Sequence, residues 1–235
     1  MKKFTLAHSA LVAAVLSALP MVATADTIDL TLTTLGNGSY VNVSSNAGSS
    51  FRSVFAGEFG MLASNSTNTS ALPNGAYDIF CLELNSPIYS GTPYRYNVVG
   101  LGTVNPNGTT GALGATGAEA IQDMWNFANG RQYDTNDFAT AFQLALWEVT
   151  FDGTNDSRTG GTFRFNGGSA VNTIVADLFN SININGTTIT LAGLTNGDAQ
   201  DLLVNPNQNE KVSEPGTLAM LGLGLLGLGT IRRRK

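Results

Sequence analysis

Histidine and cysteine are almost missing from this chain of 235 residues, in which His8 and Cys81 are the single representatives. One cysteine excludes a disulfide within the chain, and the shortage of both residue types excludes the common zinc sites, which need several such ligands. Because His8 lies in an apolar N-terminal segment that we expect to be removed, no imidazole remains for a Ser-His-Asp or Cys-His arrangement. We therefore expect a protein that is not an enzyme and that holds neither a metal nor another cofactor.

Positive charge is also scarce in the body of the chain. Residues 26–213 contain six Lys and Arg side chains against sixteen carboxylates, and the other basic residues are confined to the two ends. An acidic body is repelled by phosphate backbones, so we exclude nucleic acid as a partner.

The N-terminal segment has the composition of a secretory signal peptide. Two lysines precede an apolar run over residues 11–19, which is too short to span a bilayer, and the small residues of 23–25 precede Asp26. A charged start, a short apolar stretch and a small-x-small site are the features of such signals. We expect export by the Sec machinery, and cleavage by signal peptidase between Ala25 and Asp26, so that residues 1–25 are removed.

The C-terminal segment, residues 214–235, combines a polar break, an apolar run and a cationic end. The apolar run extends from Leu218 to Ile231, and the other notable residues are Glu214, Pro215, Gly216 and Thr217 in the break and Arg232, Arg233, Arg234 and Lys235 at the end. Apolar residues halt translocation, and Lys and Arg stay on the cytoplasmic side. As a helix, residues 217–231 would span about 22 Å, less than the ~30 Å hydrocarbon core. Such a marginal span suits a transient, processed segment.

This segment resembles the PEP-CTERM sorting signal of Gram-negative bacteria, in which Pro-Glu-Pro precedes a Gly/Leu helix and an Arg-rich tail. Here Ser213 takes the place of the first proline. The resemblance implies transient contact with the inner membrane and cleavage near Glu214-Pro215 by an exosortase. It further implies delivery to the cell surface or to an extracellular polysaccharide layer.

Between these ends, residues 26–204 have the pattern of a single β-rich α+β domain. Ile28, Leu30 and Leu32 alternate with polar residues, as in a half-buried strand. Asn-Gly pairs, which favour tight turns, recur along the domain. Further strands are predicted over 40–44, 51–62, 77–84 and 94–99, with a hairpin over 181–191. We expect an antiparallel β-sandwich or barrel.

The middle of the domain changes to helical spacing. A helix is predicted over 137–149, after Thr135 or Asn136 as N-cap. Its apolar face consists of Phe138, Ala141, Phe142, Ala145 and Val149. Other helices are predicted over 118–129, 170–179 and 198–204. They form a helical insertion in the β-rich domain, and residues 205–213, rich in Asn and Gln, are interpreted as a flexible stalk.

Two short motifs in this domain carry possible chemistry. Phe80-Cys81-Leu82 lies on a predicted strand, and the run from Phe142 to Trp147, which contains Gln143, lies on a predicted helix. Together they resemble the two motifs of bacterial surface thioester domains. The resemblance implies that the Cys81 thiol attacks the side-chain amide of Gln143 and expels ammonia. The product is an internal thioester, which an incoming amine or hydroxyl opens by becoming attached through Gln143.

Such a bond sets two physical requirements. The thiolate is the nucleophile, so the site must favour it or supply a base, and the bond must be kept from water. An apolar wall is expected from Phe80, Leu82, Phe142, Leu144 and Trp147. Without histidine, the candidates for the base are backbone dipoles, Glu83 or Glu148, or a tyrosine.

Three functions remain open from the sequence. The first is a secreted, adhesin-like surface or matrix protein that attaches covalently to an amine or hydroxyl ligand through the thioester. The second is a passive structural protein of the exopolysaccharide or biofilm matrix, in which Cys81 is a small core residue and Gln143 bonds a backbone group. The third is a secreted hydrolase with paired carboxylates, although no spacing in the chain selects a pair.

Overall fold

A computed structural model describes residues 25–106, 112–154 and 160–209 of the chain. Nearly all of the predicted signal peptide and the whole predicted sorting segment, residues 214–235, lie outside the described residues. None of the helices within the described ranges is long and apolar enough to cross a membrane.

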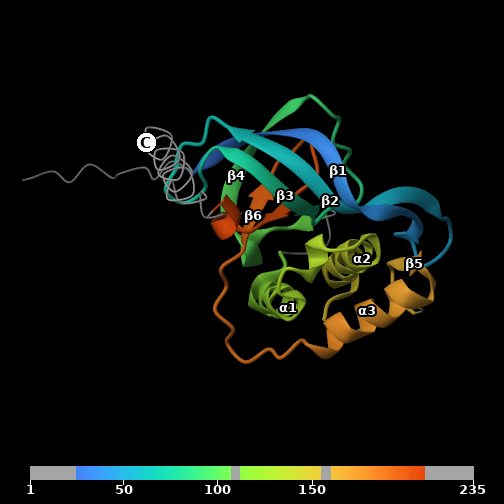
Figure 1. The fold of residues 1–235 in the computed structure, drawn as a ribbon. Helices are drawn as coiled ribbons and strands as arrows, with labels where there is room; N and C mark the ends of the chain where they lie inside the picture. Colours follow the sequence, from blue (N-terminus) through green and yellow to red (C-terminus); the bar gives the residue numbers. More distant parts are fainter. Residues whose placement is uncertain (1–24, 107–111, 155–159, 210–235) are drawn as a thin grey trace, which may run out of the picture.

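Within the described residues, seven antiparallel strands form the β part of the structure (Figure 1). They are β1 (Thr27–Ser44), β2 (Arg52–Ser64), β3 (Gly75–Cys81), β4 (Pro93–Gly100), β5 (Arg164–Asn166), β6 (Ala192–Thr195) and β7 (Leu202–Val204). Their order is β2-β3-β7-β6-β4-β1-β5, with a further pairing of β1 with β2. That pairing joins the two ends of a six-stranded run, so β1, β2, β3, β7, β6 and β4 close into a barrel and leave few open edges. The fold agrees with the predicted β-rich α+β class and favours the barrel over the sandwich.

The first strand corrects the sequence analysis. Separate strands were expected around Ile28 to Leu32 and over 40–44, and the Asn-Gly pair at 37–38 lies between them, but β1 is continuous over 18 residues. Its register against β2 shifts between Leu35 and Gly38, where Gly38 faces Gly57. Both glycines have φ near +155°, and a Cβ on Gly57 would lie 2.3 Å from the carbonyl oxygen of Asn37. The Asn-Gly pair therefore produces an irregularity that two strands share, because the absence of a side chain lets their backbones approach.

The helices lie between β4 and β6 in sequence and on one side of the strands in space (Figure 1). They are α1 (Gly114–Ala128), α2 (Asn136–Asp152) and α3 (Gly168–Asn180). Short 3-10 helices occur at Leu101–Thr103, Arg131–Tyr133 and Pro206–Asn209, the last within the predicted stalk. The predicted N-cap of α2 is confirmed, since the Thr135 side chain accepts a hydrogen bond from the backbone N–H of Phe138.

Helix α2 is the central element of the molecule. Every residue from Phe138 to Thr150 is buried, so the predicted apolar face is part of a helix that is enclosed all round. It contacts β1, β2 and β3 on the barrel and both other α-helices. Polar residues of α2, including Gln143 and Glu148, are therefore held inside the protein.

Two predictions near the end of the domain are wrong. Residues 181–191 form no hairpin but run along α1, whose side chains accept their backbone hydrogen bonds. Gln122 accepts from Thr190 and Leu191, and Asp123 accepts from Asn183. The predicted helix over 198–204 is also absent, because its last three residues are buried on both faces as β7 between β3 and β6.

The predicted strand over 77–84 is partly confirmed. The other strands near it, over 51–62 and 94–99, correspond to β2 and β4, but β3 ends at Cys81. Beyond that residue the backbone N–H groups of Leu82 and Glu83 both donate to the carbonyl oxygen of Asp201, which turns the chain out of the strand. The strand thus stops at the one cysteine.

Candidate functional site

Cys81 and Gln143 are in direct contact, although 62 residues separate them. Cys81 is the last residue of β3, Gln143 lies in the middle of α2, and both side chains are fully buried. The backbone N–H of Cys81 donates to Gln143 Oε1 at 2.8 Å, and Gln143 Nε2 donates to the carbonyl oxygen of Cys81 at 2.7 Å. The structure thus brings together the two residues singled out from the sequence.

The end of a strand pairing explains this contact. On one side of β3, Cys81 pairs with Leu202 of β7, but the pairing with β2 on the other side stops at Ile79. The N–H and C=O of Cys81 on that side are buried, and such groups cost about 1–3 kcal/mol each when they lack a partner. The side-chain amide of Gln143 supplies one donor and one acceptor, so it takes the place of the missing strand.

The thiol of Cys81 has a partner of its own. Cys81 Sγ lies 3.2 Å from Gln200 Oε1 and donates to it, and Gln200 Nε2 donates to the carbonyl oxygen of Glu83 at 2.9 Å. Burial, assisted by the charge of Glu83, raises the pKa of the Cys81 thiol far above its ordinary value. The thiol is therefore neutral in this arrangement, and the site does not hold a free thiolate.

The candidates for a base differ in their surroundings. Glu83 accepts hydrogen bonds from the Ser86 hydroxyl and from the backbone N–H of Asp201, and Glu148 is fully buried in α2. Tyr96 is a tyrosine whose pKa is raised chiefly by burial. Its buried hydroxyl has no hydrogen-bond partner among the described residues. Tyr96 is thus a neutral proton donor rather than a base.

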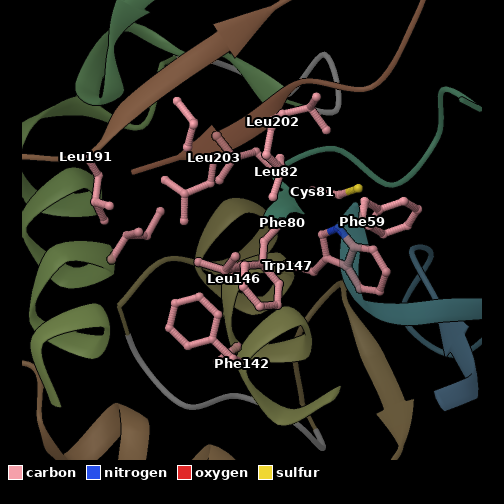
Figure 2. Close-up of a cluster of buried hydrophobic side chains, with 14 of the residues drawn as sticks. Phe59, Phe80, Cys81, Leu82, Phe142, Leu146, Trp147, Leu191, Leu202 and Leu203 are labelled. Atoms are coloured by element: carbon pink, nitrogen blue, oxygen red, sulfur yellow. The ribbon is translucent and has the colours of Figure 1, made fainter. Parts of the chain in front are cut away.

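The five residues of the predicted wall all belong to the buried core that includes Cys81. They are Phe80, Leu82, Phe142, Leu144 and Trp147, each at most 1% exposed. The rings of Phe80 and Phe142 meet edge to face, with centroids 5.0 Å apart. Figure 2 shows Phe80 and Cys81 from β3, and Leu82 just after it, beside Phe142, Leu146 and Trp147 from α2. The pair therefore lies in a dry, largely apolar interior.

Sequence reasoning missed Gln200. This half-buried glutamine bonds the Cys81 thiol from 119 residues away, and it precedes β7 in a segment that was expected to be helical. Its neighbour Asp201 was missed as well, and burial raises the pKa of Asp201 to about 6, with a smaller contribution from the charge of Glu83. No local pattern signals either role, since both depend on the pairing of β7 with β3.

Other predicted residues lie elsewhere. Asp26, the expected first residue after signal cleavage, is tied to the barrel, because its carboxylate accepts from Asn68 and its carbonyl oxygen accepts from the backbone N–H of Val98. The sorting residues 214–217 and the basic tail 232–235 lie outside the described residues. No group of three or more potential metal ligands occurs within the described ranges.

Comparison with protein-family models finds the PEP-CTERM protein-sorting motif over residues 211–235. This match confirms the predicted sorting segment and extends it by three residues toward the N-terminus. It shows that the chain carries a signal for exosortase processing and for export to the cell surface or the extracellular space. Neither the comparison with curated proteins nor that with solved structures found a match to this chain.

Proposed function

We propose that this exported protein binds covalently to an amine or hydroxyl ligand at the cell surface or in the extracellular matrix, through an internal thioester between Cys81 and Gln143. The observation that carries the proposal is the contact between the two residues. The backbone of Cys81 holds the Gln143 amide by both of its ends, in the protein interior. A thiol and a primary amide brought together from two elements are the two reactants that such a bond needs.

Closing the thioester requires the Cys81 thiol to leave its hydrogen bond with Gln200. The thiol turns from Gln200 toward Gln143, and Sγ attacks the amide carbon, so that an S–C bond forms and the C–N bond breaks. The leaving nitrogen takes up the thiol proton and departs as ammonia. The N–H of Cys81, already 2.8 Å from Gln143 Oε1, stabilises the negative charge that develops on this oxygen. Because the pKa of Cys81 is raised, attack and proton transfer to the nitrogen proceed together.

The surroundings preserve the bond once it has formed. Both residues are fully buried, and the aromatic and aliphatic side chains around them exclude water. Opening by a ligand amine or hydroxyl joins that nitrogen or oxygen to the Gln143 carbon and returns the thiol to Cys81. The product is an amide or an ester, which is a lasting attachment.

The mass of the mature protein tests this proposal. The exported wild-type protein should be lighter than its processed sequence by one ammonia, and methylamine should add to Gln143 and release an alkylatable thiol. Cys81→Ala is the control, because it keeps both backbone hydrogen bonds but cannot close the bond. A wild-type mass equal to the plain sequence, with a thiol that reacts on unfolding without methylamine, would remove the thioester.

A second function is favoured by one specific observation. The Gln143 amide already satisfies the backbone of Cys81, and the thiol already has an acceptor in Gln200, so the arrangement is complete as a structural device. The protein would then be a passive component of the exopolysaccharide or biofilm matrix. Surface retention of Cys81→Ala separates the two, because only the passive protein is retained as well as wild type. The absence of enzymatic activity remains a prediction. It applies to a carboxylate-based hydrolase and to any other class of enzyme.

A further inference from the structure

A groove of about 540 Å³ opens on the surface next to the Cys81–Gln143 pair. One wall is formed by β1 and β2 and the other by residues 84–88, which follow β3. Its volume lies in the range of small-molecule binding sites. No role for this groove follows from the thioester chemistry itself.

Aromatic rings lead from the mouth of the groove to its inner end. Tyr40 is 70% exposed, and its ring meets that of Phe55 edge to face at 5.6 Å. Phe55 in turn meets Phe59, which is nearly buried, at the same centroid distance. Trp147 and Gln200 complete the lining. The series thus connects an exposed ring with the dry interior.

The inner end of the groove is one side chain away from the thiol. Gln200 lines the groove, and its Oε1 accepts the hydrogen bond from Cys81 Sγ. Figure 2 shows the Cys81 sulfur on the side of Phe59 and Trp147, which both line the groove. A ligand that fills the groove therefore ends beside the site.

Charge distinguishes this groove from the rest of an acidic protein. Arg52 is the one charged residue of the lining, which contains no carboxylate. Its guanidinium donates from Nη2 to the carbonyl oxygen of Leu84 and to Asn85 Oδ1, both at 2.9 Å, so it is held in place. The salt bridge found among the described residues joins Arg95 to Asp29 and leaves Arg52 without a carboxylate. Arg52 thus gives the lining one fixed positive charge, while the carboxylate of Glu83 accepts a hydrogen bond from the Ser86 hydroxyl of the same lining.

We propose that the groove binds a polysaccharide chain that contains uronic acids. A pyranose ring has an apolar face and a rim of hydroxyls, and the groove has aromatic rings on one wall and the polar side chains of Ser53, Asn85 and Ser86 nearby. Arg52 supplies the planar donor that pairs with a carboxylate. The binding is non-covalent and does not depend on a thioester. Only its last step, in which a sugar hydroxyl at the inner end opens the thioester, rests on the proposed function.

Binding of defined oligosaccharides to the exported protein tests the inference. The probes are oligomers of guluronate or mannuronate, neutral cello-oligosaccharides of equal length and polyglutamate, measured by calorimetry in the Cys81→Ala protein, which cannot form a thioester. We expect the uronate oligomers to bind best. Tyr40→Ala should weaken them about tenfold, the size of one lost stacking contact. Arg52→Gln should remove the preference for the uronate over the neutral oligomer.

Matched controls lie outside the groove. Tyr89 is also a well-exposed tyrosine, and Arg164 also bonds a backbone carbonyl, but neither lines the groove, so Tyr89→Ala and Arg164→Gln should bind like the parent. Equal binding of neutral oligomers, tighter binding of polyglutamate, no binding of any probe, or indifference to Tyr40→Ala would each overturn the inference. Binding without a covalent adduct in wild type would overturn only the thioester. An adduct that does not depend on Tyr40 or Arg52 would overturn only the groove.

Discussion

Gln200 accepts the hydrogen bond of the Cys81 thiol, and it is also the side chain that stands between this thiol and the groove. The same residue is tied to the backbone of Glu83 through its nitrogen. A single glutamine therefore both bonds the sulfur and lines the groove. Because Gln200 is only half-buried, we expect its removal to change the accessibility of the thiol.

Replacing Gln200 by alanine should expose the thiol. In methylamine-treated protein, whose thiol is free whichever function is right, we expect Gln200→Ala to raise the rate of alkylation of folded Cys81 by about tenfold or more, because reactivity follows exposure. Gln208→Ala is the control, since Gln208 is also half-buried but is not the acceptor of the Cys81 thiol. Equal rates in wild type and Gln200→Ala would show that this side chain does not shield the thiol.

Gln143 should matter for stability whether or not the thioester forms. Gln143→Ala leaves the N–H and C=O of Cys81 buried without their partner, and two such groups cost about 2–6 kcal/mol. Cys81→Ala keeps both bonds and should cost about 1 kcal/mol. Urea unfolding gives the free energies of unfolding of Gln143→Ala, Cys81→Ala and wild type. The wild type is treated with methylamine beforehand, which opens any thioester. A Gln143→Ala protein as stable as Cys81→Ala would contradict the strand-replacing role of the amide.

The parts of this fold that the sequence predicts are those whose cause is local. Thr135 caps α2 through a bond to a residue three positions on, and the helical spacing that follows is visible in the chain itself. The hairpin expected over 181–191 fails because Gln122 and Asp123 of α1 take the hydrogen bonds that a partner strand would take. A three-residue strand such as β7 is too short to show a period of two.

The same distinction applies to the site. Cys81 and Gln143 are found from the sequence because both lie in short motifs within regular elements, and the structure brings them into contact. Gln200 has no motif, and its role arises only when β7 pairs with β3. The groove is equally invisible in the chain, because its lining comes from β1, β2, the segment after β3, α2 and the residue before Asp201.

The facing glycines of β1 and β2 give a third prediction. A Cβ at Gly57 would lie 2.3 Å from the carbonyl oxygen of Asn37, and its φ of +155° is unfavourable for other residues. Gly57→Ala should therefore lower the free energy of unfolding by about 3 kcal/mol or more. Gly100→Ala, where nothing lies within 4 Å of the added carbon, should change it by less than about 0.5 kcal/mol. Similar urea midpoints for both variants would contradict the close approach of the strands.

The sorting segment can be tested without reference to the domain. The PEP-CTERM match implies recognition of the residues around Glu214 and Pro215. Changing both to alanine should leave a longer, cell-associated form in place of the processed protein, as seen by mass spectrometry of cell and medium fractions. Ser213→Ala is the control, because this position already departs from the usual proline. Normal processing of the double variant would mean that the cleavage depends on other residues.

The last prediction concerns the pH dependence of stability, through Asp201. This side chain is 8% exposed, its Oδ1 accepts from the backbone N–H of Asn196, and the charge of Glu83 and the Tyr96 hydroxyl lie near it. Burial, assisted by the charge of Glu83, raises the pKa of Asp201 to about 6 in the folded protein. The unfolded value is about 3.9, so the folded state binds the proton more tightly. Protonated Asp201 therefore stabilises the folded protein fully below about pH 4, and this contribution to the free energy of unfolding is lost as the pH rises through about 6.

Asp201→Asn has no proton to lose and should not show that loss. Relative to the variant, wild type should therefore become less stable between pH 4 and pH 7, by an amount on the order of 2 kcal/mol, because one pKa unit corresponds to about 1.4 kcal/mol. Urea unfolding of both proteins at pH 4, 5, 6 and 7 measures the difference between their free energies of unfolding. The other acidic residues titrate in both proteins, so their contributions cancel in this difference. Asp198→Asn, at an exposed neighbouring aspartate, is the control and should run parallel to wild type. Parallel curves for Asp201→Asn as well would mean that Asp201 ionises in the folded protein without cost, and that its burial beside Glu83 has no energetic consequence.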